Sequence, residues 1–376
     1  MIFNKIRQAF KLNYETLNRL EIKRSAILAN YEVLKKQQEG AAIIPVLKSN
    51  AYGHGLKEMA EILNETDAPL VAVDSFPEAQ IVKKFFKREI LIIGRMPRRV
   101  YSYATSRRYH FSVADERVLE VLPKGSKIHL FLNTGMNREG IKDLPGFLEK
   151  NAKKLAQLKI VGLCSHLANA DSISPENDAQ LEKFLEALKY LERTGQRPQW
   201  IHLGNSAGVF TLKNNKLTAF RSGLALYGYN PLKPNHPKFA EANTLLQPAL
   251  ELYSKVIAKQ TVSAGEKVSY NSSYLVKTEE NIVVVPFGYY EGLPRRLSNQ
   301  AMFYCEKGQL IIAGDVCMNS TCLSSGTREL PLGTEIQLIS ANPSQSNSVD
   351  KLAAQAGMIK YEFLTDLKAN IRRVIV

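Results

Sequence analysis

The sequence predicts an α/β fold, a (β/α)8 barrel followed by a mostly β C-terminal domain. Between about residues 40 and 245, eight short apolar runs alternate with segments of helical periodicity. Eight strand–helix units are the number that closes a parallel barrel. After about Pro248 the runs become rich in β-branched residues, and helical periodicity is weak until Val349–Ala356. This change predicts a second domain built mainly of strands.

The apolar runs set the domain limits. We assign residues 11–245 to a TIM-type barrel and residues 246–376 to the β-rich domain, and the first ten residues are a candidate for one further strand of that domain. Continuous apolar runs are typical of parallel strands that are buried on both faces. The eight predicted strands are Ala41–Leu47, Leu70–Asp74, Ile90–Ile93, His110–Val113, Lys127–Leu132, Lys159–Ser165, Trp200–Leu203 and Leu217–Arg221.

Several spacers between these runs carry a single apolar face. In Asp178–Arg193, leucine and phenylalanine recur at intervals of three and four residues, and Lys57–Asn64 and Pro77–Phe86 behave similarly. This spacing predicts amphipathic helices. In the C-terminal domain, strand-like segments are predicted at Val262–Val268, Asn281–Pro286 and Gln309–Val316, with turns at Ala264-Gly265 and Glu306-Lys307-Gly308.

Composition narrows the class of protein. Of 376 residues, 50 are Lys or Arg and 36 are Asp or Glu, which gives a net charge of +14. Acidic residues are interleaved with the basic ones and no nucleic-acid-binding signature is present, so we interpret the charge as a basic surface that also favours anionic small molecules. The 45% content of hydrophobic residues excludes a disordered chain.

Cysteine content and hydropathy indicate the compartment. Four cysteines at irregular spacing are too few for a disulfide scaffold or a zinc site. The N-terminal twenty residues contain no apolar run of signal-peptide length, and no segment approaches the roughly 18–20 apolar residues of a membrane span. These features predict a soluble cytoplasmic protein with no membrane or metal partner.

The strongest chemical signal is the segment Pro45–Gly55, in which Lys48 follows a buried strand and precedes a glycine-rich loop. Burial disfavours an ammonium ion and lowers its pKa, which suits Schiff-base chemistry. From the residues alone, a strand-end lysine paired with a carboxylate is an equally good interpretation.

Four further signals follow predicted barrel strands. Arg138 lies in a glycine-flanked loop and could bind a carboxylate. His166, Asn205 and Ser206 could stack on or hydrogen-bond a ligand, and Arg221–Gly228 could bring backbone N–H groups to a phosphate. Taken singly, a solvated arginine, a packed histidine or a capping serine explains these residues equally well.

The β-rich domain contributes Val268–Tyr270, Pro286–Gly292, Cys317–Asn319 and Tyr361–Glu362. A lone tyrosine in a strand usually serves packing. Together and in this order, however, all these segments resemble the alanine racemase family over nearly the whole chain. Lys-Ser-Asn-Ala-Tyr-Gly-His-Gly, beginning at Lys48, resembles the family's cofactor-lysine signature with one tolerated change at Ser49. The resemblance implies a pyridoxal-phosphate-dependent isomerase with a barrel and a β domain.

The resemblance also implies a role for each matching residue. Lys48 would form the Schiff base with the cofactor and act as the base on one face of the substrate Cα, while Tyr270 from the partner subunit would act on the other face. Two bases are needed because the proton leaves one face and arrives on the opposite one. Arg221 would contact the pyridine nitrogen and leave it unprotonated. The other implied cofactor contacts are Tyr52, His166, Asn205, Ser206, Gly223, Leu224 and Tyr361, and the implied substrate contacts are Arg138 and Met318.

As a member of this family, the chain is expected to form a homodimer with shared active sites and to interconvert L- and D-alanine, supplying D-alanine for the peptidoglycan of the cell wall. Two alternatives stay open. One is a broad-specificity racemase acting on serine, lysine or arginine, and the other is a non-catalytic pyridoxal-phosphate-binding paralogue. A decarboxylase is disfavoured because it would place an acid, not Arg221, at the ring nitrogen.

The sequence departs from the family pattern mainly around the substrate. Phe131 stands where the family often has a carbamylated lysine that helps to place the arginine matched by Arg138. Asn133 and Asn319 each replace a usual aspartate, and Asn271 replaces the glycine after the catalytic tyrosine. In the segment Tyr289–Gly292, Tyr and Glu replace the usual Ala and Asp.

Overall fold

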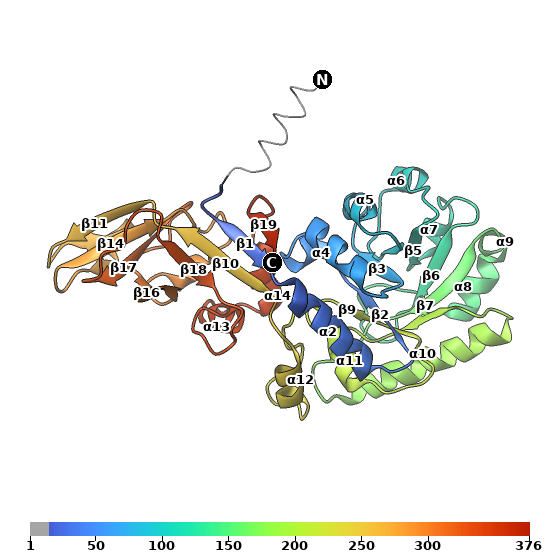
Figure 1. The fold of residues 1–376 in the computed structure, drawn as a ribbon. Helices are drawn as coiled ribbons and strands as arrows, with labels where there is room; N and C mark the ends of the chain where they lie inside the picture. The colour runs from blue at the N-terminus through green and yellow to red at the C-terminus, as the bar shows by residue number, and fades with distance from the viewer. Residues whose placement is uncertain (1–14) are drawn as a thin grey trace, which may run out of the picture. The chain divides into compact units, whose positions relative to one another are not determined.

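Two structural units follow one another along the chain in the computed structural model, which describes residues 15–376 (Figure 1). One unit is Lys23–Ala249, and the other is formed by Leu250–Val376 together with the described residues that precede Lys23. The strand proposed for the first ten residues lies outside the described residues.

The first unit contains all eight predicted barrel strands, all of them parallel. They are β2 (Ala42–Pro45), β3 (Leu70–Val73), β4 (Glu89–Ile92), β5 (Tyr109–Val113), β6 (Lys127–Phe131), β7 (Lys159–Cys164), β8 (Trp200–His202) and β9 (Ala219–Ser222). Strands β3 to β8 form one sheet in sequence order, and β2 pairs with β9.

Backbone hydrogen bonds join these two sheets into a closed barrel. At one junction, Leu47 N–H donates to Ala72 O at 2.7 Å. At the other, Thr218 N–H donates to Ile201 O at 2.9 Å and Arg221 N–H donates to Gly204 O at 3.0 Å. Because the barrel is closed, it has no edge strand with unpaired backbone N–H and C=O groups, as an open sheet would have. The prediction of a (β/α)8 barrel is therefore confirmed.

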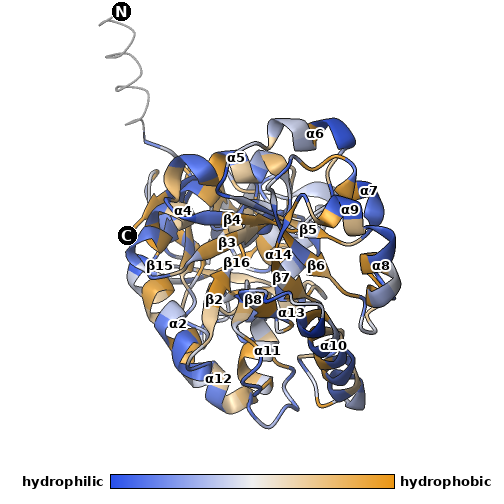
Figure 2. Ribbon diagram, turned by 90° about the vertical axis from the view of Figure 1, so that its right-hand side faces the viewer, coloured by the Kyte–Doolittle hydropathy of each residue, from blue (hydrophilic) through white to orange (hydrophobic). Residues whose placement is uncertain are grey.

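Helices surround these strands, and Figure 2 shows apolar strands inside and hydrophilic outer helix surfaces. In α5, Ser75 and Glu78 form a reciprocal capping box, and in α10 the buried residues Phe184, Leu188 and Leu191 lie on one face. The helices of this unit are α2 (Arg24–Gln37), α3 (Lys48–Tyr52), α4 (Leu56–Ile62), η1 (Leu63–Glu65), α5 (Phe76–Phe85), α6 (Arg98–Tyr103), α7 (Glu116–Leu119), α8 (Leu144–Lys150), α9 (Ala152–Leu155), α10 (Pro175–Arg193), α11 (Ser206–Thr211) and α12 (Phe239–Leu245).

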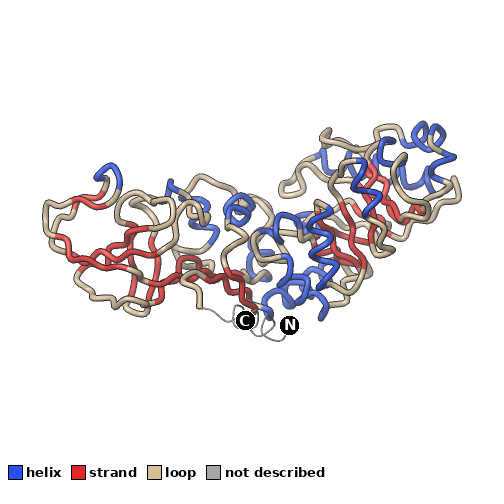
Figure 3. The backbone as a smooth tube through the Cα atoms, turned by 90° about the horizontal axis from the view of Figure 1, so that it is seen from above, coloured by secondary structure: helices blue, strands red, loops and turns tan. Residues whose placement is uncertain are grey.

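The second unit is built on a nine-stranded sheet, visible as strands in Figure 3. Its order is β11-β14-β17-β16-β15-β18-β10-β1-β19. The strands are β1 (Arg19–Ile22), β10 (Leu250–Lys255), β11 (Ala258–Val262), β14 (Glu280–Val285), β15 (Met302–Cys305), β16 (Gly308–Ile312), β17 (Thr321–Gly326), β18 (Glu335–Ile339) and β19 (Arg372–Ile375). The mostly β character predicted for this part of the chain is confirmed.

A short hairpin and a few helices complete this unit. The hairpin strands β12 (Lys267–Val268) and β13 (Tyr274–Leu275) flank the single turn η2 (Tyr270–Ser272). The helices are η3 (Arg295–Leu297), α13 (Val349–Gln355) and α14 (Lys360–Asp366). The turn predicted at Ala264-Gly265 is confirmed: with Gly265 at φ +90°, it divides the predicted segment Val262–Val268 between β11 and β12. Among residues 15–376, no helix is long and apolar enough to cross a membrane.

The barrel core depends on one small residue. Gly162 on β7 lies beside His129 on β6, and a Cβ at Gly162 would sit 2.2 Å from Nδ1 of His129. The imidazole of His129 is fully buried and has no room to move away. A glycine at this position therefore makes space for a polar ring inside the barrel.

We expect Gly162→Ala to destabilise the protein by about 1 to 3 kcal/mol, because overpacking a rigid core forces neighbouring atoms apart. The urea midpoint should fall while the slope of the transition is unchanged. Gly208→Ala is the matched control, because its nearest neighbouring atom, in Leu212, would be 3.6 Å away and alanine favours the helix. Equal midpoints for the Gly162→Ala protein and the wild type would contradict this account.

Candidate active site

The predicted cofactor lysine lies at the carboxyl end of strand β2. Val46 N–H donates to Ser222 O at 2.8 Å, which fixes the segment before Lys48 to strand β9. The Lys48 side chain is half-buried at this end of the barrel. Active sites of such barrels are built from the loops at the carboxyl ends of the strands, so the fold places Lys48 where chemistry is expected.

A left-handed turn follows Lys48 directly. Residues 49–52 have φ angles of 55°, 53°, 53° and 51°, a conformation that costs roughly 1–2 kcal/mol per non-glycine residue. Ala51 N–H donates to Leu47 O at 2.8 Å, and Ser49 N–H donates to the Glu78 carboxylate at 2.7 Å. Strain that the surrounding structure maintains in this way is a recognised mark of functional sites.

Two hydroxyl groups and a glycine form a cradle at the end of strand β9. Ser206 Oγ accepts from Gly223 N–H at 2.9 Å. A Cβ at Gly223 would lie only 2.5 Å from the Tyr52 hydroxyl, so any other residue would displace that ring. Leu224 follows in the same turn, and Asn205 caps α11 by accepting from Gly208 N–H at 3.0 Å. Hydroxyl groups around a glycine backbone suit a phosphate.

Arg221 is buried at the same end of the barrel. Its guanidinium contacts His202 Nδ1 at 2.5 Å and His166 Nδ1 at 3.2 Å. It also donates to the backbone oxygens of Ser165 at 2.6 Å, His202 at 2.8 Å and Leu203 at 3.2 Å. Each of these described contacts is with an uncharged acceptor, so the positive charge is held in place without being neutralised.

His166 lies within this positive field. Burial first, and then the charges of Arg221, Arg138 and Lys48, lower the pKa of His166 to about 3. The imidazole is therefore neutral at physiological pH and offers a flat uncharged ring. The same three cations make this end of the barrel attractive to anionic groups.

The loop that carries Arg138 is ordered by Asn133. Its Oδ1 accepts from Gly135 N–H at 3.2 Å and Asn137 N–H at 3.1 Å. The Arg138 side chain is 55% exposed, and its Nε lies 3.5 Å from a Glu139 carboxylate oxygen. Asn133 can hold this loop because an amide oxygen accepts these bonds as a carboxylate would.

Phe131 packs below the same loop. A Cβ at Gly140 would lie 2.9 Å from the Phe131 ring, and Gly140 has φ +114°. Ile141 N–H donates to Phe131 O at 2.8 Å and closes the loop onto β6. The ring therefore supports the loop of Arg138 by packing.

Gln180 connects the loops after β6 and β7, and sequence reasoning did not identify it. This buried residue of α10 donates to Thr134 Oγ1 at 3.2 Å and His166 O at 2.9 Å, and it accepts from Ala168 N–H at 2.9 Å. The available signal was a glutamine on the apolar face of an amphipathic helix, four residues before Phe184.

In the second unit, Tyr270 begins the turn η2 and its side chain is 69% exposed. Ser269, Asn271 and Ser272 around it have φ angles of 67°, 58° and 53°. Asparagine tolerates left-handed backbone better than most residues, which explains how Asn271 replaces a glycine here.

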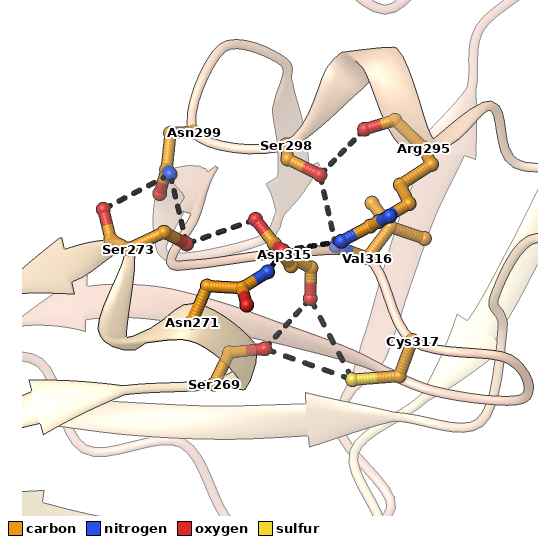
Figure 4. A network of polar contacts seen from close by, with 9 residues as sticks. All are labelled: Ser269, Asn271, Ser273, Arg295, Ser298, Asn299, Asp315, Val316 and Cys317. Carbon is orange, nitrogen blue, oxygen red and sulfur yellow. Dashed lines mark hydrogen bonds and ion pairs between the residues drawn. The ribbon is translucent and has the colours of Figure 1, made fainter.

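Asp315 holds this turn in place (Figure 4). Its carboxylate accepts from Asn271 Nδ2 at 2.8 Å, Ser273 Oγ at 2.9 Å and Arg295 at 2.7 Å. Its backbone oxygen accepts from Ser269 Oγ at 2.7 Å. These donors, with Arg295 first, lower the pKa of the Asp315 carboxyl group. Through its carboxylate and its backbone oxygen, Asp315 therefore fixes the turn on both sides of Tyr270.

Met318 belongs to the segment that continues from Asp315. Its side chain is 55% exposed, and its backbone oxygen accepts from Tyr290 N–H at 2.9 Å. Asn319 Nδ2 donates to a carboxylate oxygen of Glu291 at 2.9 Å. The two residues that depart from the family pattern here therefore form a hydrogen bond with each other. Tyr361 lies on α14 and is partly exposed.

The predicted residues thus fall into two groups. Lys48, the cradle residues, His166 and Arg221 converge at the carboxyl end of the barrel, where the Arg138 loop also begins. Tyr270, Met318 and Tyr361 lie in the second unit. A strand-end amine, a glycine-lined cradle and a fixed cation together define a barrel enzyme of the class that binds pyridoxal phosphate.

Comparison with known proteins identifies the family. Residues 22–231 match the alanine racemase N-terminal domain and residues 249–375 match the alanine racemase C-terminal domain. The chain therefore belongs to the alanine racemase family, and it is a racemase that uses pyridoxal phosphate as its cofactor. The predictions of family, enzyme class and cofactor are confirmed.

Individual relatives cover nearly the whole chain. The alanine racemase of Geobacillus kaustophilus is 31% identical over 94% of this chain and 93% of its own length. The solved alanine racemase of Bacillus anthracis with bound L-Ala-P is 29% identical, with a TM-score of 0.87 over 96% of each chain. The Bartonella henselae enzyme, solved with covalently bound pyridoxal phosphate, shares the fold with a TM-score of 0.82 at 24% identity over 96% of this chain and all of that one.

We expect Asp315→Asn to loosen the turn that carries Tyr270, because the amide loses the ion pair with Arg295 and weakens the acceptor for Asn271 and Ser273. Amide hydrogen exchange in residues 269–273 should become faster by about tenfold. The lowered pKa means that the carboxylate form stabilises the fold above the ordinary carboxyl pKa, and this contribution is lost as the pH falls through the lowered value.

The matched control is Asp350→Asn, which removes an exposed acid paired with Lys360 in the same unit and should leave the Tyr270 turn unchanged. Identical exchange in the Asp315→Asn protein and the wild type would show that Asp315 does not hold the turn.

Proposed function

We propose that the enzyme interconverts L- and D-alanine with two bases, the Lys48 amine on one face of the substrate Cα and the Tyr270 phenol of the partner subunit on the other. The observation that carries this proposal is the cluster of Arg221, Arg138 and Lys48 around a neutral His166. This cluster provides an amine at a site that attracts a carboxylate and a phosphate.

The residues of the barrel unit fit pyridoxal phosphate. Tyr52, Ser206, Gly223 and Leu224 would hold its phosphate, because a side chain at Gly223 would fill the cradle. We propose that Arg221 faces the ring nitrogen and that the remaining contacts come from the residues matched in sequence, His166, Asn205 and Tyr361. When bound, the cofactor withdraws electrons and acidifies the proton on Cα.

The chain's own groups then move the proton. Lys48 at the end of strand β2 holds or releases a proton at Nζ, and Tyr270 does so at its phenolic oxygen. We propose that Arg138 and the segment at Met318 receive the substrate carboxylate.

A homodimer with shared sites is the arrangement that the second unit supports. Tyr270 and Met318 are 69% and 55% exposed, although both lie on backbone that the Asp315 hydrogen bonds fix in place. A rigid exposed tyrosine is available to a second copy of the chain. We therefore propose that each active site combines the barrel unit of one subunit with Tyr270 of the other.

Alanine is the substrate that we favour. The substitutions Asn271 and Asn319 bond to Asp315 and Glu291 within the same unit, so they add no unsatisfied group that would select a larger polar side chain. We propose that the product D-alanine serves peptidoglycan synthesis and that the enzyme acts in the cytoplasm, where its four free cysteines would remain reduced.

Replacing the proposed second base should separate racemisation from one-sided proton exchange. We expect Tyr270→Phe to lower the racemisation rate by about 10² to 10⁴-fold. In deuterated water, one enantiomer of alanine should still exchange its α-proton through Lys48. Tyr103→Phe, at a tyrosine that is 70% exposed, is the matched control and should be fully active. Normal racemisation by the Tyr270→Phe enzyme would refute the assignment.

Site sharing can be tested with dimers built from two different variants. Lys48→Ala and Tyr270→Phe homodimers should both be inactive. A heterodimer of the two, purified through two affinity tags, should contain one intact site and show about half of the wild-type activity, as a twofold-symmetric shared interface requires. An inactive heterodimer would mean that each site takes both residues from one chain.

A further inference from the structure

Three buried histidines form a continuous chain of contacts through the core of the barrel. Nδ1 of His202 contacts Arg221 at 2.5 Å, and Nε2 of His202 lies 2.8 Å from Nδ1 of His129. Nε2 of His129 in turn lies 3.0 Å from Nδ1 of His110. The three residues are at most 1% exposed.

The series of histidine contacts ends at the carboxylate of Glu89, at the opposite end of the barrel strands from Arg221. Nε2 of His110 lies 2.9 Å from a Glu89 carboxylate oxygen, within hydrogen-bonding distance although not in straight alignment. Glu89 begins strand β4 and also pairs with Lys127 at the start of strand β6. Lys127 lines a cavity of about 630 Å³, so the far end of the chain reaches solvent.

The chemistry of the two ends fixes the direction of every hydrogen bond between them. A guanidinium can only donate, so Nδ1 of His202 must accept from Arg221. A neutral imidazole has one donor and one acceptor, so Nε2–H of His202 donates to His129, and Nε2–H of His129 donates to His110. His110 then carries its proton on Nε2, which faces the Glu89 carboxylate at 2.9 Å, a group that can only accept. All three rings are therefore Nε2–H tautomers.

The rings must be neutral for this reasoning to hold, and burial ensures this. Desolvation lowers the pKa of His110 to about 4, even though the neighbouring Glu89 opposes the shift. Desolvation and nearby positive charges also lower the pKa of His129 and His202 well below the usual histidine value. No ring in the chain is protonated at physiological pH.

We propose that Glu89 and His110 are positioning residues, which polarise the histidine chain and thereby hold the Arg221 guanidinium in one orientation toward the cofactor ring nitrogen. The proposal rests on the role given to Arg221 above. The negative charge of Glu89 at the far end of the chain strengthens the acceptor at His202 Nδ1. With the opposite tautomer, two donors would face each other at 2.5 Å.

Nitrogen NMR of the holoenzyme, labelled with ¹⁵N in its histidine rings, tests the tautomers directly. We expect His110, His129 and His202 to carry the proton on Nε2, without change between about pH 6 and 9. Variants that remove one histidine at a time assign the signals. A proton on Nδ1 of His202, or titration of this ring in that range, would overturn the proposal.

Glu89→Gln tests the role of the carboxylate. An amide carries no net charge, so it polarises the chain less, while Arg221 still requires Nδ1 of His202 to accept. We expect the Nε2–H tautomers to remain, the ¹⁵N signals of His202 and the visible absorption band of the bound cofactor to shift, and kcat to fall by about threefold to tenfold with KM unchanged. Glu89→Asp keeps the carboxylate and should keep these readouts close to those of the wild type.

Glu61→Gln, at an exposed acid of α4, is the matched control and should change none of these readouts. Unchanged ¹⁵N signals of His202 and an unchanged absorption band in Glu89→Gln would overturn the proposal while racemisation remains intact. Failure of the two-base assignment would instead appear in Tyr270→Phe, with the tautomers of the wild type unaffected.

Discussion

A buried guanidinium is the constraint on which the barrel site depends. Removing a cation from water is costly unless its hydrogen bonds are satisfied. Around Arg221 the barrel provides backbone oxygens and two imidazoles from the segments after β7 and β8. These acceptors satisfy the N–H donors of Arg221 but do not neutralise its positive charge. The carboxyl end of the barrel thereby keeps a positive field that is fixed in direction.

Carboxylates have the complementary task in both units, which is to hold left-handed backbone beside a proposed base. The carboxylate of Glu78 binds the first amide of the turn after Lys48, and the carboxylate of Asp315 binds the side chains of Asn271 and Ser273 that follow Tyr270. Non-glycine residues leave this conformation unless neighbouring groups hold them. Each proposed base is therefore attached to backbone that has little freedom to move.

The architecture could be predicted from the sequence because buried strands are recognisable as short runs of apolar residues. All eight barrel strands correspond to apolar runs, and α10 corresponds to a repeated apolar face. The left-handed turn at residues 49–52 could not be predicted, because serine, alanine and tyrosine do not favour it locally. Besides local hydrogen bonds, the contact of Ser49 N–H with Glu78, 29 residues away, holds it, and that contact is not visible in the local sequence.

The same limit explains why the histidine chain escaped sequence reasoning. His110 and His129 each stand inside an otherwise apolar strand, where one histidine resembles an isolated packing residue. Their contact depends on the register of β5 and β6 and on the space left by Gly162. Resemblance to the family supplied individual site residues, whereas side-chain networks that join strands needed the structure.

The departures near Arg138 share one electrostatic consequence. Asn133 keeps the hydrogen bonds that order the loop but carries no charge, and Phe131 supports the loop by packing where a carbamylated lysine would place a negative group. Both changes remove negative charge beside Arg138. The remaining acid contact is with Glu139 at 3.5 Å, at an exposed position where ion pairs are weak. The charge of Arg138 therefore stays available, as its proposed role in binding the substrate carboxylate requires.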